Sequence, residues 1–517
     1  MPTKTKPWIK TIKLKIAPPS LKDNTADVDR LIKGIKKGLE TEDVTVDFSL
    51  VKKIPNALRK SNYQINAILH ENQNGWRLID LIPSQNRNGI YGLSVDLGSS
   101  TVVIRLLDLA SQETKDEMSF HNPQIKIGAD ILTRIHFASQ EGGLDRLQGF
   151  LKGRLNEEIN QLAKRNSVDT NAIVAMSVAG NTTMTHLFLG LDPYWICREP
   201  YIPVINKLEL IKSSELGLNI NPQAPVLVFP NVGSYFGGDL VAGILASGMM
   251  HQDDISFLVD VGTNAEVVIG NSDWLMGCAG AAGPALEGGV ANIGMMAGPG
   301  VRDKVAIDPC TSEFTIRTIR NHPPVGICGS GLIDLVAQLF LAGMIDLRGK
   351  FVPKKCGGRL IEIDEISHLI VAFPENSGTD QALTLSQVDI DGLIRSKAAM
   401  YTILTTITNT ANIPMEKITK FYVGGTFGSY IDPRSAITIG MILDLPVETY
   451  IPLGNSSLKG ASMALLSIEA RNEIFRIRDQ ITYLELNVNQ EFMNLFSAAK
   501  FIPHTDRSLF PSVNEQI

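Results

Sequence analysis

The sequence of 517 residues holds only five cysteines, and no two of them are close. The nearest pair, Cys310 and Cys328, is 18 residues apart, so no Cys-x-x-Cys spacing for zinc, an iron–sulfur cluster or a thioredoxin-like centre is present. An odd, scattered set of thiols is typical of a reducing compartment. The opening residues, MPTKTKPWIK, lack the apolar core of a signal peptide. We therefore expect a cytoplasmic protein.

Long apolar runs and an excess of basic charge are also missing. The most apolar segment, 327–345, contains Asp334 and Gln338, which indicates a buried helix and argues against a membrane span. The net charge is -6, yet residues 1–60 carry 14 Lys or Arg against 7 Asp or Glu, and the rest carries 34 against 47. An acidic body argues against nucleic acid as a partner. The basic head is interpreted as a solvated helical face.

Patterning divides the chain into several folding units. At roughly 150 residues per domain, the length allows about three domains. The apolar spacing of residues 27–39 predicts a helix, and the turn cluster Asn86-Arg87-Asn88-Gly89 ends this first unit. From Ile90 onward strands and helices alternate, and the alternation starts again near residue 257. We therefore expect a small unit at 1–88 and two related α/β halves at 89–252 and 253–517, with a ligand cleft between the halves.

The expected elements follow from the same patterns. Strands are predicted at 91–97, 101–109, 172–178, 226–229, 257–261, 265–269 and 421–423. Helices are predicted at 145–165, 238–249 and 388–408, with others opening near Asn181 and after Gly331. His186 within an apolar helix and Cys328 in a glycine-rich turn are interpreted as packing residues, in preference to a cobalt ligand and a reactive thiol.

A repeated hairpin carries the clearest sign of chemistry. Ser94-Val95-Asp96-Leu97-Gly98-Ser99-Ser100-Thr101 recurs 164 residues later as Leu258-Val259-Asp260-Val261-Gly262-Thr263-Asn264-Ala265. In each copy an apolar strand delivers one aspartate, a glycine permits a tight turn, and two small polar residues follow. Such a turn directs N–H groups and hydroxyls at a phosphate, while the aspartate can hold Mg²⁺ or its waters. One copy alone is most simply a hairpin turn, but two copies, each opening one half, favour facing phosphate sites.

A third element comes late in the chain. Phe421-Tyr422-Val423-Gly424-Gly425-Thr426-Phe427-Gly428 is an apolar strand that runs into a Gly-Gly turn. Adjacent glycines let the backbone lie flat against a base or ribose, where a Cβ would clash. Gly-Gly turns are common by themselves, so this one is informative as the third part of an ordered set.

This order of two phosphate hairpins and a Gly-Gly turn resembles the ATPase superfamily of acetate and sugar kinases, heat-shock chaperones and actin. The resemblance implies duplicated ribonuclease-H-like ATPase halves in an α/β protein, joined here to a small α+β linker domain at the N-terminus. The segments 237–243 and 454–461 are similar to the superfamily's small-residue connecting helices, which cross closely. The superfamily uses the aspartate of the first segment as a general base. The resemblance therefore gives Asp239 that role, and the alternative is a helix N-cap.

Further strings narrow the resemblance to the reductive activators of corrinoid-dependent proteins, over nearly the whole chain. The strings are Val178-Ala179-Gly180-Asn181-Thr182-Thr183-Met184, Gly283-Pro284-Ala285-Leu286-Glu287-Gly288-Gly289, Gly326-Ile327-Cys328-Gly329-Ser330-Gly331-Leu332-Ile333-Asp334 and Phe501-Ile502-Pro503-His504-Thr505-Asp506. Members of this family bind ATP, dock on a corrinoid protein of a methyltransferase system and return Co(II) to Co(I). The resemblance also suggests a homodimer.

The resemblance implies a site for Mg²⁺ and ATP in this chain. Asp96 and Asp260 would serve Mg²⁺, and these two residues with Asp239 would be catalytic. ATP would be held by Gly98, Ser99, Ser100, Thr101, Gly262, Thr263, Asn264, Gly329, Ser330, Gly424, Gly425 and Thr426.

The sequence departs from the family in one respect that bears on electron transfer. Family members carry an iron–sulfur module, whereas this sequence has no cysteine before Cys197 and none after Cys356. We therefore expect no iron–sulfur cluster in this chain and a separate ferredoxin-like electron donor. Two other functions stay open. The first is an ATP-driven chaperone that reactivates a cobalamin-dependent enzyme without a redox step, and the second is a small-molecule kinase with Asp239 as base.

Overall fold

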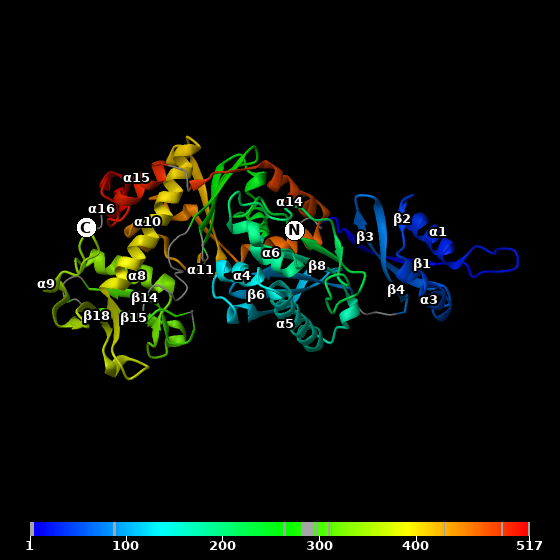
Figure 1. Cartoon of the computed structure of the whole chain (residues 1–517), viewed down its shortest axis with the longest axis horizontal. Coiled ribbons are helices and arrows are strands. Elements are labelled where there is room, and N and C mark those ends of the chain that lie inside the picture. Colours follow the sequence, from blue (N-terminus) through cyan, green and yellow to red (C-terminus); the bar gives the residue numbers. More distant parts are fainter. Residues whose placement is uncertain are drawn as a thin grey trace. The chain divides into compact units, whose positions relative to one another are not determined.

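The computed structural model shows a mixed α/β chain (Figure 1). The residues that the structure describes are 5–85, 89–261, 265–280, 293–295, 298–308, 311, 313–428, 430–486 and 490–514. They form two compact units. Unit 1 comprises Met1–Ala246 and Ser457–Asp479, and unit 2 comprises Ser247–Ser456 and Gln480–Ile517.

The N-terminal part of unit 1 is a four-stranded sheet covered by helices. The strand order is β1-β3-β4-β2, with β1 (Ile9–Lys15), β2 (Val44–Thr45), β3 (Gln64–Asn72) and β4 (Gly75–Pro83). The helices are α1 (Asp27–Leu39), α2 (Phe48–Val51) and α3 (Ile54–Lys60). Helix α1 buries Leu31 and Ile35 in the core and leaves Lys33 and Lys37 exposed. The predicted small α+β unit with a solvated basic face is therefore confirmed.

The second sheet of unit 1 has the order β7-β6-β5-β8-β10-β9. Its strands are β5 (Tyr91–Leu97), β6 (Thr101–Asp108), β7 (Glu113–His121), β8 (Ile173–Gly180), β9 (Ile211–Lys212) and β10 (Pro225–Val228). Strands β5, β6 and β7 are antiparallel neighbours, while β8 and β10 run parallel to β5. The helices are α4 (Ile131–Ala138), α5 (Gly143–Arg165), α6 (Thr182–Leu189) and α7 (Gly238–Ser247).

Unit 2 contains a sheet of the order β21-β20-β11-β12-β13-β22. Its strands are β11 (Ile255–Val261), β12 (Ala265–Gly270), β13 (Leu275–Gly280), β20 (Ile418–Gly424), β21 (Tyr450–Gly454) and β22 (Ile481–Tyr483). Strands β11, β12 and β13 are antiparallel neighbours, and β20 and β21 run parallel to β11. The helices that follow these strands include α10 (Gln387–Thr410), α11 (Gly425–Gly428) and α12 (Pro433–Thr438).

The two large sheets repeat one design. In chain order, the first three strands of each form an antiparallel meander. Two later strands, β8 and β10 in unit 1 and β20 and β21 in unit 2, extend the sheet in parallel from the side of the first strand. A long helix joins the meander to the first parallel strand, α5 in unit 1 and α10 in unit 2. The predicted duplication of a ribonuclease-H-like half is confirmed by this strand order.

Unit 2 also carries an insertion between β13 and α10. It contains two small sheets, β15-β14-β16 and β17-β18-β19. The elements are β14 (Val301–Ile307), β15 (Phe314–Thr318), β16 (Gly326–Ile327), α8 (Gly329–Leu341), α9 (Pro353–Cys356), β17 (Leu360–Ile363), β18 (Ile366–Ala372) and β19 (Leu383–Ser386). The apolar segment predicted to be a buried helix is α8, whose Leu335 and Leu339 are fully buried. Within the described parts of the chain, no helix combines the length and apolarity needed to cross a bilayer.

The C-terminal string is held by a buried lysine. After α15 (Gln490–Ala498) the chain returns to α10, where the Lys397 ammonium donates to the carbonyls of Phe501 and Pro503, and it ends with α16 (Pro511–Asn514). Burial lowers the pKa of Lys397 well below its usual range. Gly440 has a φ of 72°, and a Cβ there would lie 2.0 Å from the Pro503 oxygen. The string Phe501–Asp506 therefore has a structural role.

Helix α13 (Ser456–Leu466) is the element around which unit 1 is packed. It lies on the face of β5 that carries the small residues Gly92 and Ser94. The Ser462 hydroxyl bonds to the Ser94 hydroxyl at 2.8 Å, and a Cβ on Gly92 would lie 2.8 Å from Leu465. The other face of β5, with Leu93 and Val95, is buried with α5. Helix α14 (Ile468–Gln480) follows.

The same helix crosses α7 at close range. A Cβ on Gly460 would lie 2.1 Å from the Ala242 carbonyl oxygen, a distance that no Cβ can adopt without moving the backbone. The prediction that the two small-residue helices cross closely is confirmed.

We predict that Gly460→Ala destabilises unit 1 by about 1–3 kcal/mol, because the added methyl group must push α13 away from α7. The matched control is Gly153→Ala in the middle of α5, where a Cβ meets nothing within 4 Å. There alanine should stabilise the protein by about 0.5–1 kcal/mol. Urea unfolding of both variants checks this, and equal free energies of unfolding for the two would contradict the close crossing.

Candidate functional site

In unit 1 the predicted site residues gather at one edge of the large sheet. Asp96 lies near the end of β5 and is paired with Ala179 of the parallel strand β8. Helix α6 begins directly after β8, and its N-cap Asn181 accepts a hydrogen bond from the Met184 N–H at 2.9 Å. Because the carboxyl ends of parallel strands share one edge, Asp96 and the amino end of α6 lie at the same edge. Ligands of open α/β sheets bind at such edges.

The first hairpin is held in shape by a residue that sequence reasoning missed. Asn122 donates from its side chain to the Gly98 carbonyl at 3.0 Å and from its backbone to the Ser100 carbonyl at 2.9 Å. A Cβ on Gly98 would lie 2.2 Å from the Thr101 oxygen, so the turn requires glycine. Ser100 is exposed, and Ser99 and Thr101 are half-buried. Only the Asn-Pro dipeptide after β7 hinted at this support.

Asp239 lies in the first turn of α7 and close to Asp96. Its carboxylate accepts a hydrogen bond from the Leu240 N–H at 2.9 Å. Because α7 begins at Gly238, Asp239 is the second residue of the helix, and the alternative of an N-cap is wrong. Burial, together with the negative charge of Asp96, raises the pKa of Asp239 to about 6. The negative charge of Asp96 therefore acts on the Asp239 carboxyl at this edge.

In unit 2, Asp260 and the Gly-Gly turn are direct neighbours. Asp260 of β11 is paired with Gly424 of the parallel strand β20. A Cβ on Gly424 would lie 2.8 Å from the Ser456 hydroxyl and 3.5 Å from a carboxylate oxygen of Asp260. Gly425 is the first residue of α11 and has a φ of 81°, a backbone conformation that a residue with a side chain would disfavour. Thus the structure brings together Asp260, the Gly-Gly turn and Ser456, which the sequence placed in the connecting helix 454–461 and not among the ligand-binding residues.

Other predicted site residues are placed as follows. Gly329 and Ser330 form the buried amino end of α8, where the Ser330 hydroxyl lies 3.2 Å from the Cys328 sulfur. Thr426 is part of α11. Gly262, Thr263 and Asn264 of the second hairpin, and the string Gly283–Gly289, lie outside the described residues.

His186 and Cys328 are packing residues, as expected. The Nδ1 of His186 lies 2.7 Å from the Thr182 carbonyl, and its Nε2 lies 3.1 Å from the Val204 N–H. Both ring nitrogens therefore have backbone partners, and burial lowers the pKa of this fully buried imidazole. Cys328 is the buried N-cap residue of α8.

The carboxylates fit a magnesium ion that travels with a phosphate ligand. Mg²⁺ keeps several waters and uses one or two carboxylates beside substrate phosphates, so Asp96 or Asp260 suffices in each unit. A dedicated metal cage is a different arrangement, and in the parts of the chain that the structure describes no group of three or more His, Cys, Asp or Glu residues could hold a metal ion.

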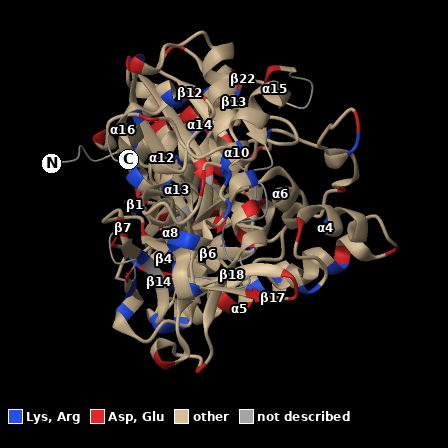
Figure 2. Cartoon of the chain, turned by 90° about the vertical axis from the view of Figure 1, so that its left-hand side faces the viewer, with Lys and Arg blue, Asp and Glu red and all other residues tan. Residues whose placement is uncertain are grey.

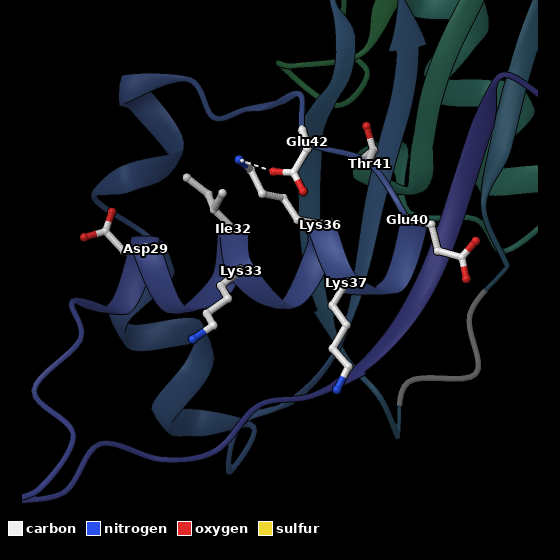
Figure 3. Close-up of a pocket in the computed structure, with 8 residues that line it drawn as sticks. All are labelled: Asp29, Ile32, Lys33, Lys36, Lys37, Glu40, Thr41 and Glu42. Carbon is white, nitrogen blue, oxygen red and sulfur yellow. Dashed lines mark hydrogen bonds and ion pairs between the residues drawn. The ribbon is translucent and has the colours of Figure 1, made fainter.

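A surface hollow is lined by α1, which packs on the N-terminal sheet, and by the residues that follow this helix, and none of the predicted site residues lines it (Figure 3). Its charged lining balances, with Lys33, Lys36 and Lys37 against Asp29, Glu40 and Glu42. In Figure 3 the Lys36 side chain turns toward Glu42, and the two form an ion pair at 3.5 Å. Figure 2 shows acidic and basic residues interleaved along other elements as well. A hollow of this kind has no preference for a phosphate.

Two α/β halves share one strand order, and each opens with a strand that bears an aspartate near its carboxyl end, which defines a protein of the ASKHA nucleotide-binding fold. The chain belongs to the RACo family. Residues 1–88 match the RACo linker region, residues 91–252 match the RACo middle region, and residues 254–514 match the C-terminal domain of RACo, the ASKHA domain. The resemblance predicted from the sequence strings is confirmed.

Known relatives match this chain over most of its length. The corrinoid activation enzyme RamQ of Eubacterium limosum is 31% identical over 483 residues, which is 91% of this chain and 79% of that protein. A [Co(II) methylated amine-specific corrinoid protein] reductase of Methanosarcina barkeri is 23% identical, over 79% of this chain and 76% of that protein. A solved structure named reductive activator for corrinoid, iron–sulfur protein has a TM-score of 0.90 at 37% identity, and the match covers 99% of this chain and 82% of that one.

The raised pKa of Asp239 predicts how stability depends on pH. An aspartate that binds its proton below about pH 6 when folded, but only below about pH 3.9 when unfolded, makes the protein less stable as the pH rises through this window. Asp239→Asn should therefore be more stable than the wild type by about 1–3 kcal/mol at pH 8, and this gain should fall by roughly half at pH 5. Urea unfolding at the two pH values measures the gain.

The control for this prediction is Asp145→Asn, at an exposed aspartate in the first turn of α5. This variant should show no gain in stability at pH 8. A loss of stability in Asp239→Asn at pH 8 would mean that the fold stabilises the charged form of the Asp239 carboxylate. That result would contradict a raised pKa for this buried carboxyl.

Proposed function

We propose that this protein is an ATP-dependent activator of a corrinoid protein, which supports the reduction of Co(II) to Co(I). The observation that carries the proposal is an aspartate-bearing strand end in each half of a chain that matches all three RACo regions. The names of its relatives, a corrinoid activation enzyme and a reductase of a corrinoid protein, support the same activity. The domains proposed for it are 1–88 as linker, 89–252 as middle half and 253–517 as ATPase half.

ATP binding is assigned to both units. Asp96 and Asp260 would hold Mg²⁺ or its waters, the turn Gly98–Thr101 and the equivalent turn 262–264 would bind phosphates, and the Gly424–Thr426 turn would take the adenosine. Asp239, with a pKa of about 6, would orient the attacking water. The closeness of Gly424 to Asp260 and Ser456 supports the assignment of the adenosine to this turn, because it places the turn beside the proposed Mg²⁺ ligand.

The redox step needs one electron for each cobalt: Co(II) gains an electron and becomes Co(I), while ATP and water give ADP and phosphate. The sequence has no closely spaced cysteines to hold a cluster, so the electron is assigned to a separate ferredoxin-like donor. An uphill gap of about 200 mV for one electron corresponds to about 5 kcal/mol. That is also about the difference in affinity needed to invert a 1:99 equilibrium, so differential docking driven by ATP can offset the gap.

We predict that Asp260→Ala abolishes ATP hydrolysis while the free energy of unfolding stays within about 1 kcal/mol of the wild type, because a carboxylate placed beside a phosphate site repels more than it stabilises when the ligand is absent. The matched control is Asp254→Ala, at an exposed aspartate just before β11. Phosphate release is the measurement, and wild-type turnover by Asp260→Ala would remove Asp260 from the site.

The activity itself is tested with a Co(II) corrinoid protein of a methyltransferase system. With ATP and a strong reductant, this protein should convert Co(II) to Co(I), which is followed by visible absorption. Asp260→Ala should not accelerate the conversion. No acceleration by the wild type over reductant alone would contradict the proposal.

Two other outcomes point to the alternative functions. Release of the cofactor on ATP addition without reduction would favour a chaperone that reactivates a cobalamin-dependent enzyme, consistent with the few cysteines. Phosphoryl transfer to acetate or a sugar would favour a kinase with Asp239 as its base.

A further inference from the structure

Unit 1 contains a buried cation without a carboxylate partner. Arg134 of α4 is fully buried, and its Nε donates to the Gly128 carbonyl at 2.9 Å. One terminal nitrogen lies 3.4 Å from the Met184 sulfur, which is a weak acceptor, and the other has no hydrogen-bond partner in the described structure. The acid whose charge acts on Arg134 is Asp130, the N-cap residue of α4. The Asp130 carboxylate accepts hydrogen bonds from the backbone N–H and the hydroxyl of Thr133.

Three other buried cations among the described residues have stronger partners than a sulfur atom, although the Nε of Arg30 also lacks a hydrogen-bond partner. Arg30 forms an ion pair with Asp23 and donates to backbone carbonyls as well. Lys397 donates to two carbonyls, and Arg471 donates to the Glu71 carbonyl and lies over the ring of Trp8. An unpaired buried charge is costly, and proteins keep such groups where an opposite charge arrives later or where function needs them.

The position of Arg134 connects it to the phosphate hairpin. The Met184 sulfur that it contacts also lies 3.8 Å from the Asn122 side-chain nitrogen, and this same nitrogen donates to the Gly98 carbonyl. The backbone of Met184 is bonded to Asn181 at the amino end of α6. The guanidinium is therefore linked to the hairpin through the Met184 sulfur and Asn122, and Met184 belongs to the first turn of α6.

We infer that Arg134 is the buried counter-charge of the nucleotide phosphates at the Gly98–Thr101 hairpin. It is a positioning residue, because it acts through Asn122 and Met184 and does not touch the nucleotide. In a water-free layer its charge is poorly screened, so it attracts a polyphosphate more strongly than a surface lysine would. Burial lowers the pKa of Arg134 to about 10, which leaves it a cation at neutral pH. The inference rests on the proposed phosphate site at this hairpin.

The test compares ligands of different charge in calorimetric titrations. Arg134→Met should weaken ATP binding by about tenfold or more, weaken ADP binding less, and leave adenosine unchanged, since adenosine carries no phosphate. Arg134→Lys keeps the charge and should bind ATP within about threefold of the wild type. Arg30→Met, which removes a buried but ion-paired arginine of the N-terminal sheet, should not alter the ratio of ATP to adenosine affinity.

A second pair of variants keeps Arg134 in place. Met184→Glu supplies a carboxylate next to the guanidinium and should weaken ATP about tenfold relative to the neutral, equally long Met184→Gln. Met184→Glu should also melt at a higher temperature than Met184→Gln without nucleotide. Equal ATP affinities in this pair, or equal losses of ATP and adenosine in Arg134→Met, would overturn the inference. A wild type that binds no ATP would instead overturn the proposed function.

Discussion

The close approach of α13 to the β5 sheet and to α7 is the constraint on which unit 1 depends. Along β5 the side chains alternate, with Leu93 and Val95 buried with α5 and the small Ser94 against α13. The next residue on the α13 face is Asp96. The same alternation that lets a helix lie flat on the strand therefore delivers a carboxylate to the edge where we propose that the nucleotide binds. The position of Asp96 is therefore set by the geometry of strand β5 and not by a loop.

Much of the site is built from the backbone and from residues that hold it. Gly98 is required because a Cβ there would meet the Thr101 backbone oxygen, and at Gly424 a Cβ would displace the Ser456 hydroxyl. Asn122 donates two hydrogen bonds to carbonyls of the hairpin, and Asn181 accepts one from the first turn of α6. Polar groups that are committed to the fold in this way keep N–H groups oriented before a ligand arrives, which lowers the entropy lost on binding.

Local patterns in the sequence predicted the local parts of this site. The helix at 27–39, the strand at 91–97 and the first hairpin follow from apolar spacing and turn residues, and they have the predicted bounds or nearly so. The contacts of Asn122 and Arg134 depend on Met184, 62 and 50 residues away along the chain, and no local pattern records them. Asp239 was ambiguous because the start of α7 depends on how Gly237 packs against Asn181.

The anchoring of Trp8 has a consequence for how modules can be joined to this protein. Its indole N–H donates to the Ala464 carbonyl in α13, at 3.0 Å, and Arg471 of α14 covers the ring. The first strand of the N-terminal sheet thus begins at a point fixed on the helix that organises the rest of unit 1. A carrier protein fused ahead of Trp8 by a short, stiff connector would be held at a defined site on this unit, and tether length would set its reach.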